Sequence, residues 1–128
     1  MNAEPQRFML VADATVHPAG MLTLNDRDRL VSFVDELCYQ IGMEEIDKMA
    51  RVIPPEIDSG PGVSVLSLIT TSHIVIHTFP RFAHFMLDVS SCKRFCPNEA
   101  LDFIRDELEV KEWRTVLAWP QPINLMEL

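Results

Sequence analysis

Apolar residues recur at helical spacing in the segment that follows Asn25. They lie three or four positions apart and would line one side of a helix: Leu30, Phe33, Val34, Leu37 and Ile41. Asn25 is the expected N-cap, and Asp26 and Asp28 would place negative charge in the first turn, where the helix dipole favours it. Gly42 would end the helix, because glycine readily adopts the left-handed conformation that often follows a helix.

Strand-like segments precede and follow this helix. Residues 7–13 (RFMLVAD) form an apolar run typical of a buried strand, and residues 17–20 form the loop that leaves it. Residues 45–53 alternate roughly between the two sides of a strand. The proline- and glycine-containing residues 54–62 cannot continue a central strand. Three further strands are expected after this loop: residues 63–70, 73–78 and 84–89.

A second helix and a closing strand complete the expected order. Residues 97–108 begin with a proline, which the first turn of a helix tolerates, and carry three apolar residues on one side: Leu101, Ile104 and Leu108. Residues 115–119 form the closing strand. This order predicts an α+β fold, a two-layer α/β sandwich whose mostly antiparallel sheet carries two helices on one face. The other face of the sheet is left open, and formation of a homodimer would cover it.

Length and net charge indicate how many domains the chain forms and which kinds of partner it can bind. The chain has 128 residues, so a single domain spanning residues 1–128 is expected. Its formal net charge of −8 at pH 7 argues against a nucleic-acid partner, because phosphate binding depends on a basic surface. An acidic surface favours a cationic small-molecule substrate instead, through long-range attraction.

The cysteines and the N-terminal residues indicate a compartment. There are three cysteines without a regular framework, which is typical of a reducing environment. The first residues lack the basic region of a secretory signal, and no stretch reaches the ~20 apolar residues that a membrane span needs. We therefore expect a cytoplasmic protein that has no membrane partner.

The residues with the most distinctive chemistry lie between positions 64 and 92. Ser72 and His77 occur in an apolar, strand-like context. Ser64 lies eight residues before Ser72, and Cys92 lies twenty residues after it. Serine, histidine and cysteine are side chains with which enzymes make and use covalent electrophiles. A serine–histidine pair in a strand is structural more often than catalytic, so these residue types alone do not decide between the two roles.

The same stretch resembles the self-cleaving segment of the prokaryotic S-adenosylmethionine decarboxylase family. In that family a Glu-Ser-His triplet precedes an Ile-His-Thr-aromatic-Pro run, and here Ser72-His73 and residues 76–80 (IHTFP) stand in register with it. An Asp-Val pair followed three residues later by cysteine is present as Asp88-Val89 and Cys92. The expected order of elements also matches over nearly the whole chain.

The resemblance implies a proenzyme that cuts its own chain between Thr71 and Ser72. Ser72 Oγ would attack the Thr71 carbonyl, and elimination would leave a pyruvoyl group, derived from Ser72, as the cofactor. The amine of S-adenosylmethionine would form a Schiff base with that ketone and lose carbon dioxide, which serves spermidine and polyamine biosynthesis. His77 and Ser64 would assist the cleavage, and Cys92 would return a proton to the decarboxylated carbon.

Three features depart from the family pattern. Thr71 replaces the glutamate before the serine, and Arg81 stands where the family has an acidic residue that can bind ribose hydroxyls. Residues 54–62 lack the aromatic side chain on which adenine would stack, although Phe79 keeps the other platform. Phe79 and Arg81 are thus the expected substrate-binding residues. Two alternatives stay open: a pyruvoyl-dependent decarboxylase of another amino acid, and an uncleaved, non-catalytic homologue that binds or regulates a partner.

The strand pattern also limits how these residues can meet. Ser72 and His77 face opposite sides of a regular strand, so they could cooperate only across a bend or bulge. His73 and His77 share a side, an arrangement that could suit a metal ion. The sequence offers no evident third ligand, and we expect no metal site.

Overall fold

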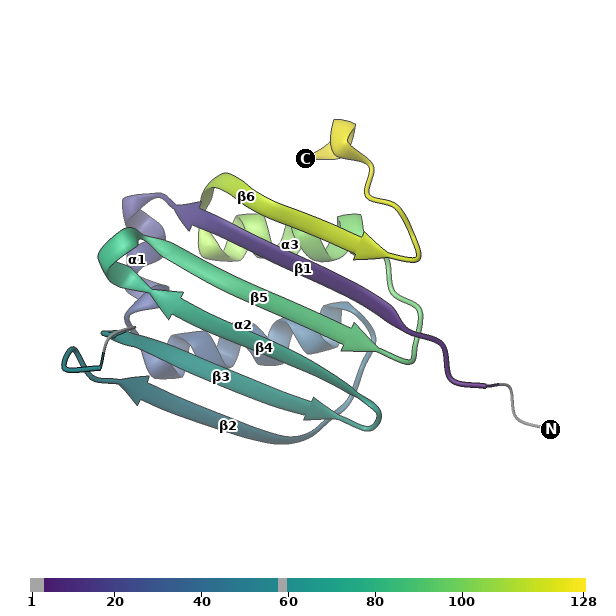
Figure 1. Cartoon of the computed structure of the whole chain (residues 1–128), viewed down its shortest axis with the longest axis horizontal. Helices are drawn as coiled ribbons and strands as arrows, with labels where there is room; N and C mark the ends of the chain where they lie inside the picture. The colour runs from purple at the N-terminus through teal and green to yellow at the C-terminus, as the bar shows by residue number, and fades with distance from the viewer. Residues whose placement is uncertain (1–3, 58–59) are drawn as a thin grey trace.

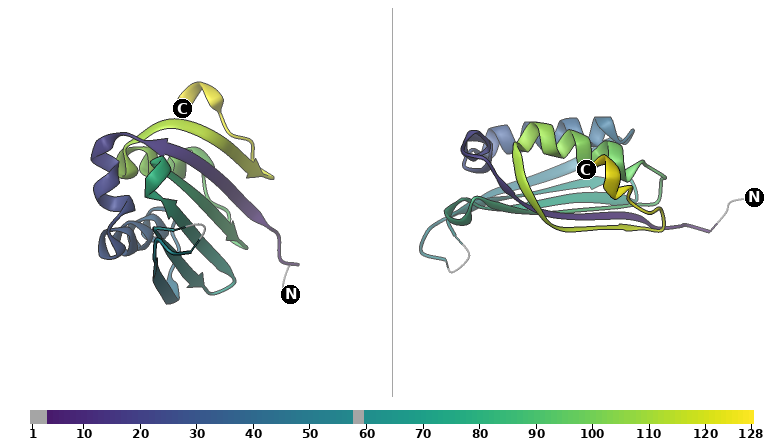
Figure 2. Two further views of the ribbon diagram at one scale, coloured as in Figure 1. Left: turned by 60° about the vertical axis from the view of Figure 1, so that its left-hand side comes forward. Right: turned by 90° about the horizontal axis from the view of Figure 1, so that it is seen from above.

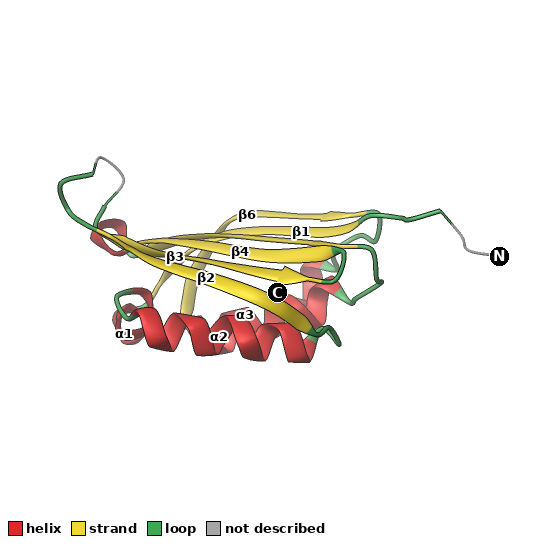
Figure 3. Ribbon diagram, turned by 90° about the horizontal axis from the view of Figure 1, so that it is seen from below, coloured by secondary structure: helices red, strands yellow, loops and turns green. Residues whose placement is uncertain are grey.

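The computed structural model describes residues 4–57 and 60–128, and its elements form two layers (Figures 1 and 3). One layer is a six-stranded sheet in the spatial order β2-β3-β4-β5-β1-β6, in which every neighbouring pair of strands is antiparallel. The strands are β1 (Phe8–Val16), β2 (Glu45–Ile53), β3 (Gly62–Ile69), β4 (Ser72–Phe79), β5 (His84–Ser91) and β6 (Val110–Trp119). The predicted α+β sandwich is therefore confirmed.

The second layer consists of helices on one face of the sheet (Figure 3). They are α1 (Met21–Leu24), α2 (Arg27–Gln40) and α3 (Pro97–Leu108), of which the one-turn α1 was not predicted. Short 3₁₀ segments, η1 (Pro18–Gly20), η2 (Pro80–Phe82) and η3 (Leu125–Glu127), complete the described elements. Within the described ranges, no helix combines the length and the apolar character that crossing a membrane requires.

The N-cap of α2 differs from the prediction. Asp26 is the cap, and its side chain accepts a hydrogen bond from the backbone nitrogen of Arg29 at 3.0 Å. The choice of Asn25 was wrong: its side-chain amide donates to the Met21 carbonyl and so closes α1. Asparagine and aspartate are equally good caps, so the sequence could not separate two adjacent candidates. Gly42 follows α2 with φ +74°, as expected.

The predicted bounds are correct for β2 and α3 and too short for β1 and β6. Strand β1 continues to Val16 because Ala12, Ala14 and Val16 keep alternate positions buried beyond the apolar run. Strand β6 begins at Val110 rather than at residue 115 and pairs with β1 through two register shifts. As an edge strand it exposes many polar side chains, which concealed its first half in the sequence.

The core lies between the helices and one face of the sheet. Its largest fully buried side chains come from both layers: Phe85, Leu10, Leu24, Leu30, Leu37, Ile74, Ile76, Leu87, Leu101, Ile104, Leu108 and Val34. Burying one such side chain contributes about 1.5–3 kcal/mol relative to leaving it in water. No helix of the described residues covers the opposite face, which we call the open face (Figure 2). It exposes six large apolar side chains: Met49, Leu66, Leu68, Met86, Leu117 and Trp119.

Thr78, within the IHTFP run, has a structural role. Its Oγ1 accepts a hydrogen bond from the backbone nitrogen of Val63 and donates one to the Leu24 carbonyl, each at 2.9 Å. It thereby joins β4 to β3 and to α1 in the buried layer. Gly62 packs against the same residue so closely that a Cβ there would lie 2.2 Å from the Thr78 carbonyl oxygen. This packing fixes the strand on which His77 lies.

Candidate functional site

A two-residue turn, Thr70-Thr71, connects β3 to β4, and Ile69 pairs with Ser72 across it. The bond between Thr71 and Ser72 therefore lies at one end of the sheet, where the turn passes into β4. Thr71 is exposed, whereas Ser72 is 9% exposed and faces the helix layer. The expected cleavage bond thus joins an accessible residue to a buried one.

Two hydrogen bonds hold the Ser72 hydroxyl. It donates to Ser91 Oγ at 3.1 Å and accepts from the backbone nitrogen of Cys92 at 3.2 Å. Both partners lie at the end of β5, the strand next to β4. The hydroxyl is therefore fixed from one side by neighbouring backbone and side chain.

Cys92 lies at the same bond. Its side chain is exposed, and its Sγ contacts the carbonyl oxygen of Thr71 at 3.4 Å. The structure thus brings together three of the sequence-predicted residues, Thr71, Ser72 and Cys92. With Ser91 they form a group that we call the cleavage-turn cluster.

Ser64 and His77 form a second group, which we call the open-face pair. They are directly opposite each other in the β3–β4 pairing, and Ser64 Oγ lies 2.7 Å from His77 Nδ1. Both side chains lie on the open face, where His77 is exposed and Ser64 is half-buried. The hydrogen bond orients the imidazole and leaves its Nε2 without a described hydrogen-bond partner.

The two groups do not meet within one chain. β4 pairs with β3 and with β5 without a register shift, so no bend or bulge turns Ser72 and His77 toward the same side. The two residues are five positions apart, or about 16 Å along a strand that rises about 3.3 Å per residue. His77 therefore cannot act on the Thr71–Ser72 bond of its own chain in this arrangement.

A hollow on the open face surrounds His77. Its lining includes Asp13, Val75, Met86 and Asp88, which come from three adjacent strands. Asp88 Oδ1 also lies 4.0 Å from His73 Nε2. The two carboxylates make this hollow suitable for a positively charged group. Sequence reasoning missed Asp13, although a carboxylate inside an otherwise apolar strand was a usable signal.

The expected substrate-binding residues lie at the end of β4 remote from the cleavage turn. Phe79 stacks on His84 with ring centroids 5.8 Å apart. Arg81 is exposed in η2, and neither Phe79 nor Arg81 lines the hollow around His77. Within one chain the structure does not bring them to Ser72.

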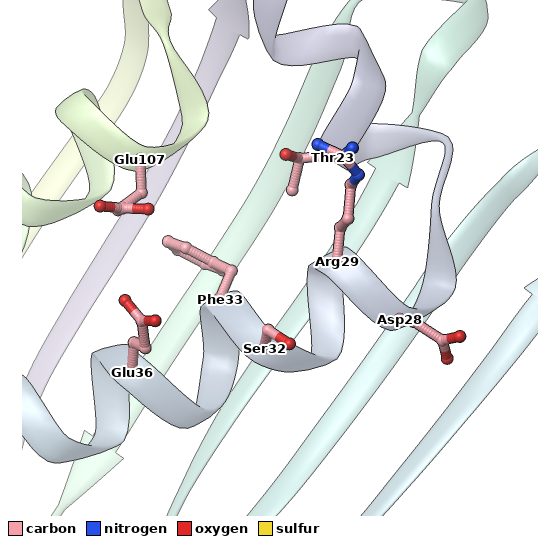
Figure 4. Close-up of a pocket in the computed structure, with 7 residues that line it drawn as sticks. All are labelled: Thr23, Asp28, Arg29, Ser32, Phe33, Glu36 and Glu107. Carbon is pink, nitrogen blue, oxygen red and sulfur yellow. The ribbon is translucent and has the colours of Figure 1, made fainter.

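A further cavity lies on the helix side, between α2 and the end of α3 (Figure 4). Glu36 and Glu107 point into it from the two helices, and Arg29 and Phe33 contribute to its lining. It contains none of the sequence-predicted residues. Among the residues that the structure describes, no group of three or more histidine, cysteine, aspartate or glutamate side chains is arranged to hold a metal ion.

Cys38 and Cys92 have different environments. Cys38 is buried, and its thiol donates to the Met43 carbonyl. Burial raises the pKa of the Cys38 thiol, and the carboxylates of Glu45 and Asp35 raise it further. Cys38 is therefore a poor nucleophile, and Cys92 is the thiol at the candidate site.

Comparison with known proteins gives consistent matches. The family model for S-adenosylmethionine decarboxylase matches residues 11–118. A curated relative from a Geobacillus species, an S-adenosylmethionine decarboxylase proenzyme, is 38% identical over 55 residues, 43% of this chain and 44% of the relative. The Bacillus velezensis relative of the same name is 32% identical over 85 residues, 66% of this chain and 64% of the relative. Both matches thus span less than two thirds of the relatives' own length.

Further similarity comes from an archaeal protein and from a solved structure. The S-adenosylmethionine decarboxylase proenzyme of Sulfurisphaera tokodaii is 40% identical over 91 residues, 70% of each chain. The crystal structure of the adenosylmethionine decarboxylase from Aquifex aeolicus superimposes with a TM-score of 0.74 at 19% identity, covering 95% of each chain, and so shares the fold. The matched segment contains the cleavage-turn cluster and the open-face pair, and the chain belongs to the S-adenosylmethionine decarboxylase family.

Proposed function

We propose that this protein is a pyruvoyl-dependent decarboxylase that cleaves itself between Thr71 and Ser72 and acts on S-adenosylmethionine for spermidine and polyamine biosynthesis. One observation carries the proposal: Ser72 Oγ is held at the start of β4, and the Cys92 thiol contacts the carbonyl of the bond to be cut. Membership in the family supports the same reaction. The residues present therefore fit both the formation of a pyruvoyl group from Ser72 and the decarboxylation that this group would support.

The cleavage step follows from the chemistry of Ser72. Its hydroxyl oxygen bonds to the Thr71 carbonyl carbon, the C–N bond breaks, and the hydroxyl proton is transferred to the released nitrogen. The resulting ester is eliminated when Ser72 loses its α-hydrogen and the Thr71 carboxylate departs with the former hydroxyl oxygen. Water then replaces the nitrogen, which leaves as ammonia. Thr71 contributes only its backbone carbonyl, so a threonine there is compatible with the reaction.

The pyruvoyl group formed from Ser72 supplies a ketone that binds the substrate amine and accepts the electrons released with carbon dioxide. Cys92 would deliver a proton there, a role supported by the contact of its thiol with the Thr71 carbonyl and by its exposure to solvent. This role needs a free thiol, which a reducing compartment maintains, and we propose a cytoplasmic location for that reason.

The substrate is a positively charged amine in this proposal. S-adenosylmethionine carries a sulfonium and an ammonium group, and the hollow around His77 offers two carboxylates, Asp13 and Asp88. Opposite charges attract strongly where water is partly excluded. We expect these two residues to favour cationic substrates over neutral ones.

We infer that the protein works as a homodimer whose open faces pack together. Six large apolar side chains are exposed on that face, and two antiparallel sheets commonly pack face to face about 10 Å apart. The separation of the open-face pair from Ser72 supports the same inference. In a dimer, His77 and Ser64 of one chain would serve the cleavage bond of the other, which Thr71 and Cys92 leave accessible.

Co-expression of two chains that are each impaired in cleavage tests this arrangement. A Ser72→Ala chain keeps His77, and a His77→Ala chain keeps Ser72, so a mixed dimer would rebuild one complete site. We expect the His77→Ala chain to be cut when co-expressed with Ser72→Ala chains and to stay largely uncut alone. If co-expression leaves it as uncut as it is alone, the pair does not act between chains.

Intact mass spectrometry of the purified protein tests the function itself. Two fragments that divide between Thr71 and Ser72, the second blocked by pyruvate, are expected. Release of labelled carbon dioxide from carboxyl-labelled S-adenosylmethionine then measures the decarboxylase. A single uncut species after prolonged incubation would support the non-catalytic homologue instead.

One observation favours a second candidate within the same chemistry. Arg81 offers only hydrogen-bond donors where the family has an acceptor for ribose. A pyruvoyl-dependent decarboxylase of another amino acid would keep the cleavage-turn cluster and lose the nucleoside contacts. Carbon dioxide release from a panel of amino acids, compared at equal concentration with S-adenosylmethionine, distinguishes the two.

A further inference from the structure

Ser91 has no role in the chemistry described so far, yet it contacts the reacting hydroxyl. We propose that Ser91 is a positioning residue for self-cleavage, and that it orients the Ser72 hydroxyl so that the oxygen presents a free lone pair for attack on the neighbouring carbonyl. This inference rests on the proposed function, because it concerns how Ser72 is aimed. It adds a residue that neither the sequence motif nor the family resemblance had singled out.

The hydrogen bonds of Ser91 are complete. Its side chain is 2% exposed at the end of β5. Its Oγ accepts from Ser72 Oγ at 3.1 Å and from the backbone nitrogen of Lys93 at 2.8 Å. It donates its own hydrogen to the Lys93 carbonyl at 2.9 Å. A hydroxyl has one hydrogen and two lone pairs, so all three positions of Ser91 are used.

This saturation fixes the direction of the Ser72 hydroxyl. Because the Ser91 hydrogen is committed to Lys93, Ser91 can only accept from Ser72, and the Ser72 hydrogen must point toward it. One lone pair of Ser72 Oγ accepts from the Cys92 nitrogen. The remaining lone pair is left unoccupied by the described hydrogen bonds. A hydroxyl held in this way needs little reorganisation before it attacks.

Ser91 acts by orientation and not as a base. The chain of hydrogen bonds from Ser72 through Ser91 ends on the Lys93 carbonyl oxygen, which does not hold a proton near neutral pH. The proton of Ser72 therefore ends on the released nitrogen, as in the proposed cleavage step. Ser91 is itself unchanged by the reaction. Because it orients Ser72 Oγ, its loss should slow the attack of that oxygen on the Thr71 carbonyl carbon.

The chain provides a matched control. Ser90 is the preceding residue of β5 and pairs with His73 on the open face, away from the Ser72 hydroxyl. Substituting Ser90 changes the same amino acid in the same strand. Threonine and valine at position 91 give a second comparison, since they have nearly the same shape and differ in the hydroxyl.

The test measures the rate of cleavage of freshly synthesised full-length chains, with fragments counted by intact mass. We expect Ser91→Ala to slow cleavage about tenfold or more, and Ser91→Val to slow it similarly. Ser91→Thr and Ser90→Ala should stay close to the parent. Thermal unfolding of each uncut chain accompanies the rates, and if Ser91→Ala does not fold, the Thr and Val variants decide the question.

Hydroxylamine separates orientation from a later defect. It cuts esters, so it accelerates chain breakage only when Ser72 has already attacked. Ser91→Ala chains should gain little from hydroxylamine, because their slow step precedes the ester. Three results would overturn this inference and leave the proposed function intact. They are cleavage of Ser91→Ala at the parent rate, equal cleavage rates for Ser91→Thr and Ser91→Val, and full rescue of Ser91→Ala by hydroxylamine. A parent chain that is never cut would overturn the proposed function and this inference with it.

Discussion

The cleavage-turn cluster and the open-face pair differ in what surrounds them. Ser72 and Ser91 are buried at a sheet end, where neighbouring strands hold them by hydrogen bonds to backbone and side chain. Ser64 and His77 lie in the middle of a sheet face, and among the described residues their side chains hydrogen-bond only to each other. The cleavage-turn cluster can keep its geometry within a single chain. The open-face pair has an oriented imidazole but no group in its own chain to act on.

This contrast assigns different contributions to the two groups. In the proposed function the cleavage-turn cluster supplies the atoms that react, and the fold of a single chain holds its two buried serines in place. In the same proposal the open-face pair assists proton transfer, and its target must arrive at the open face. Substitutions in the cluster should therefore abolish or misdirect chemistry, whereas those in the pair should slow it.

The largest effect is expected for Ser72→Ala, which removes the attacking oxygen. Cleavage between Thr71 and Ser72 should be abolished, because only a hydroxyl or a thiol can carry out the acyl shift. The fold should remain, since one hydrogen-bonded hydroxyl contributes only about 1 kcal/mol to stability. Intact mass and a thermal unfolding curve check the two expectations together. Fragments of unchanged size in this variant would identify the break as ordinary proteolysis.

His77→Ala should slow cleavage about a hundredfold or more, the usual range for loss of an acid–base group. Ser64→Ala should have a smaller effect, and the double variant should resemble His77→Ala, because Ser64 acts through the hydrogen bond to Nδ1. The rates of fragment formation in the three variants measure this.

His73→Ala is the matched control, since His73 lies four positions before His77 on the same face of β4. It should be cut at nearly the parent rate. Equal slowing by His73→Ala and His77→Ala would show that the open-face pair has no special role.

Cys92→Ala should separate cleavage from turnover. Cleavage should proceed, because the proton that Cys92 is proposed to deliver is needed only after the pyruvoyl group exists. Decarboxylation per cut chain should fall about a hundredfold. Cys96→Ala is the control, because Cys96 is also an exposed thiol and lies at the N-terminal end of α3 rather than in the cleavage-turn cluster. Parent-like turnover in Cys92→Ala would remove this thiol from the mechanism.

Much of this arrangement could be predicted from the sequence, because it follows from local periodicity. The alternation of β4 placed Ser72 and His77 on opposite sides, and the structure confirms that no bulge brings them together. The expectation that Cys92 shares a site with Ser72 came from the family resemblance and not from periodicity, and the cysteine does lie at the Thr71 carbonyl.

The remaining features depend on contacts between strands that no single segment encodes. Ser91 meets Ser72 across nineteen residues of sequence, and nothing local distinguishes it from Ser90 except its buried side of the strand. Asp13 joins the hollow around His77 only because β1 lies beside β5 in the sheet. The N-cap of α2 was missed for a different reason, because two adjacent residues had the same chemistry.

The smallest effect is expected at Arg81, which lies at the far end of the strand that carries His77. A guanidinium has a fixed positive charge and only donors, so it repels a sulfonium and cannot accept from ribose hydroxyls. Arg81→Glu should therefore improve the use of S-adenosylmethionine. Each recovered hydrogen bond to a buried polar substrate contributes about 1–3 kcal/mol, so kcat/KM should rise about tenfold.

Two controls make this result specific to the position. Lys111→Glu, at an exposed site at the start of β6, changes the net charge of the chain by the same amount and should leave kcat/KM close to the parent value. The extent of cleavage should be the same in all three proteins, because Arg81 and Ser72 lie at opposite ends of β4. An improvement shared by Lys111→Glu would reflect long-range attraction of a cation. Unchanged or lower turnover in Arg81→Glu would place the ribose elsewhere, and would favour a substrate whose carboxylate pairs with the arginine.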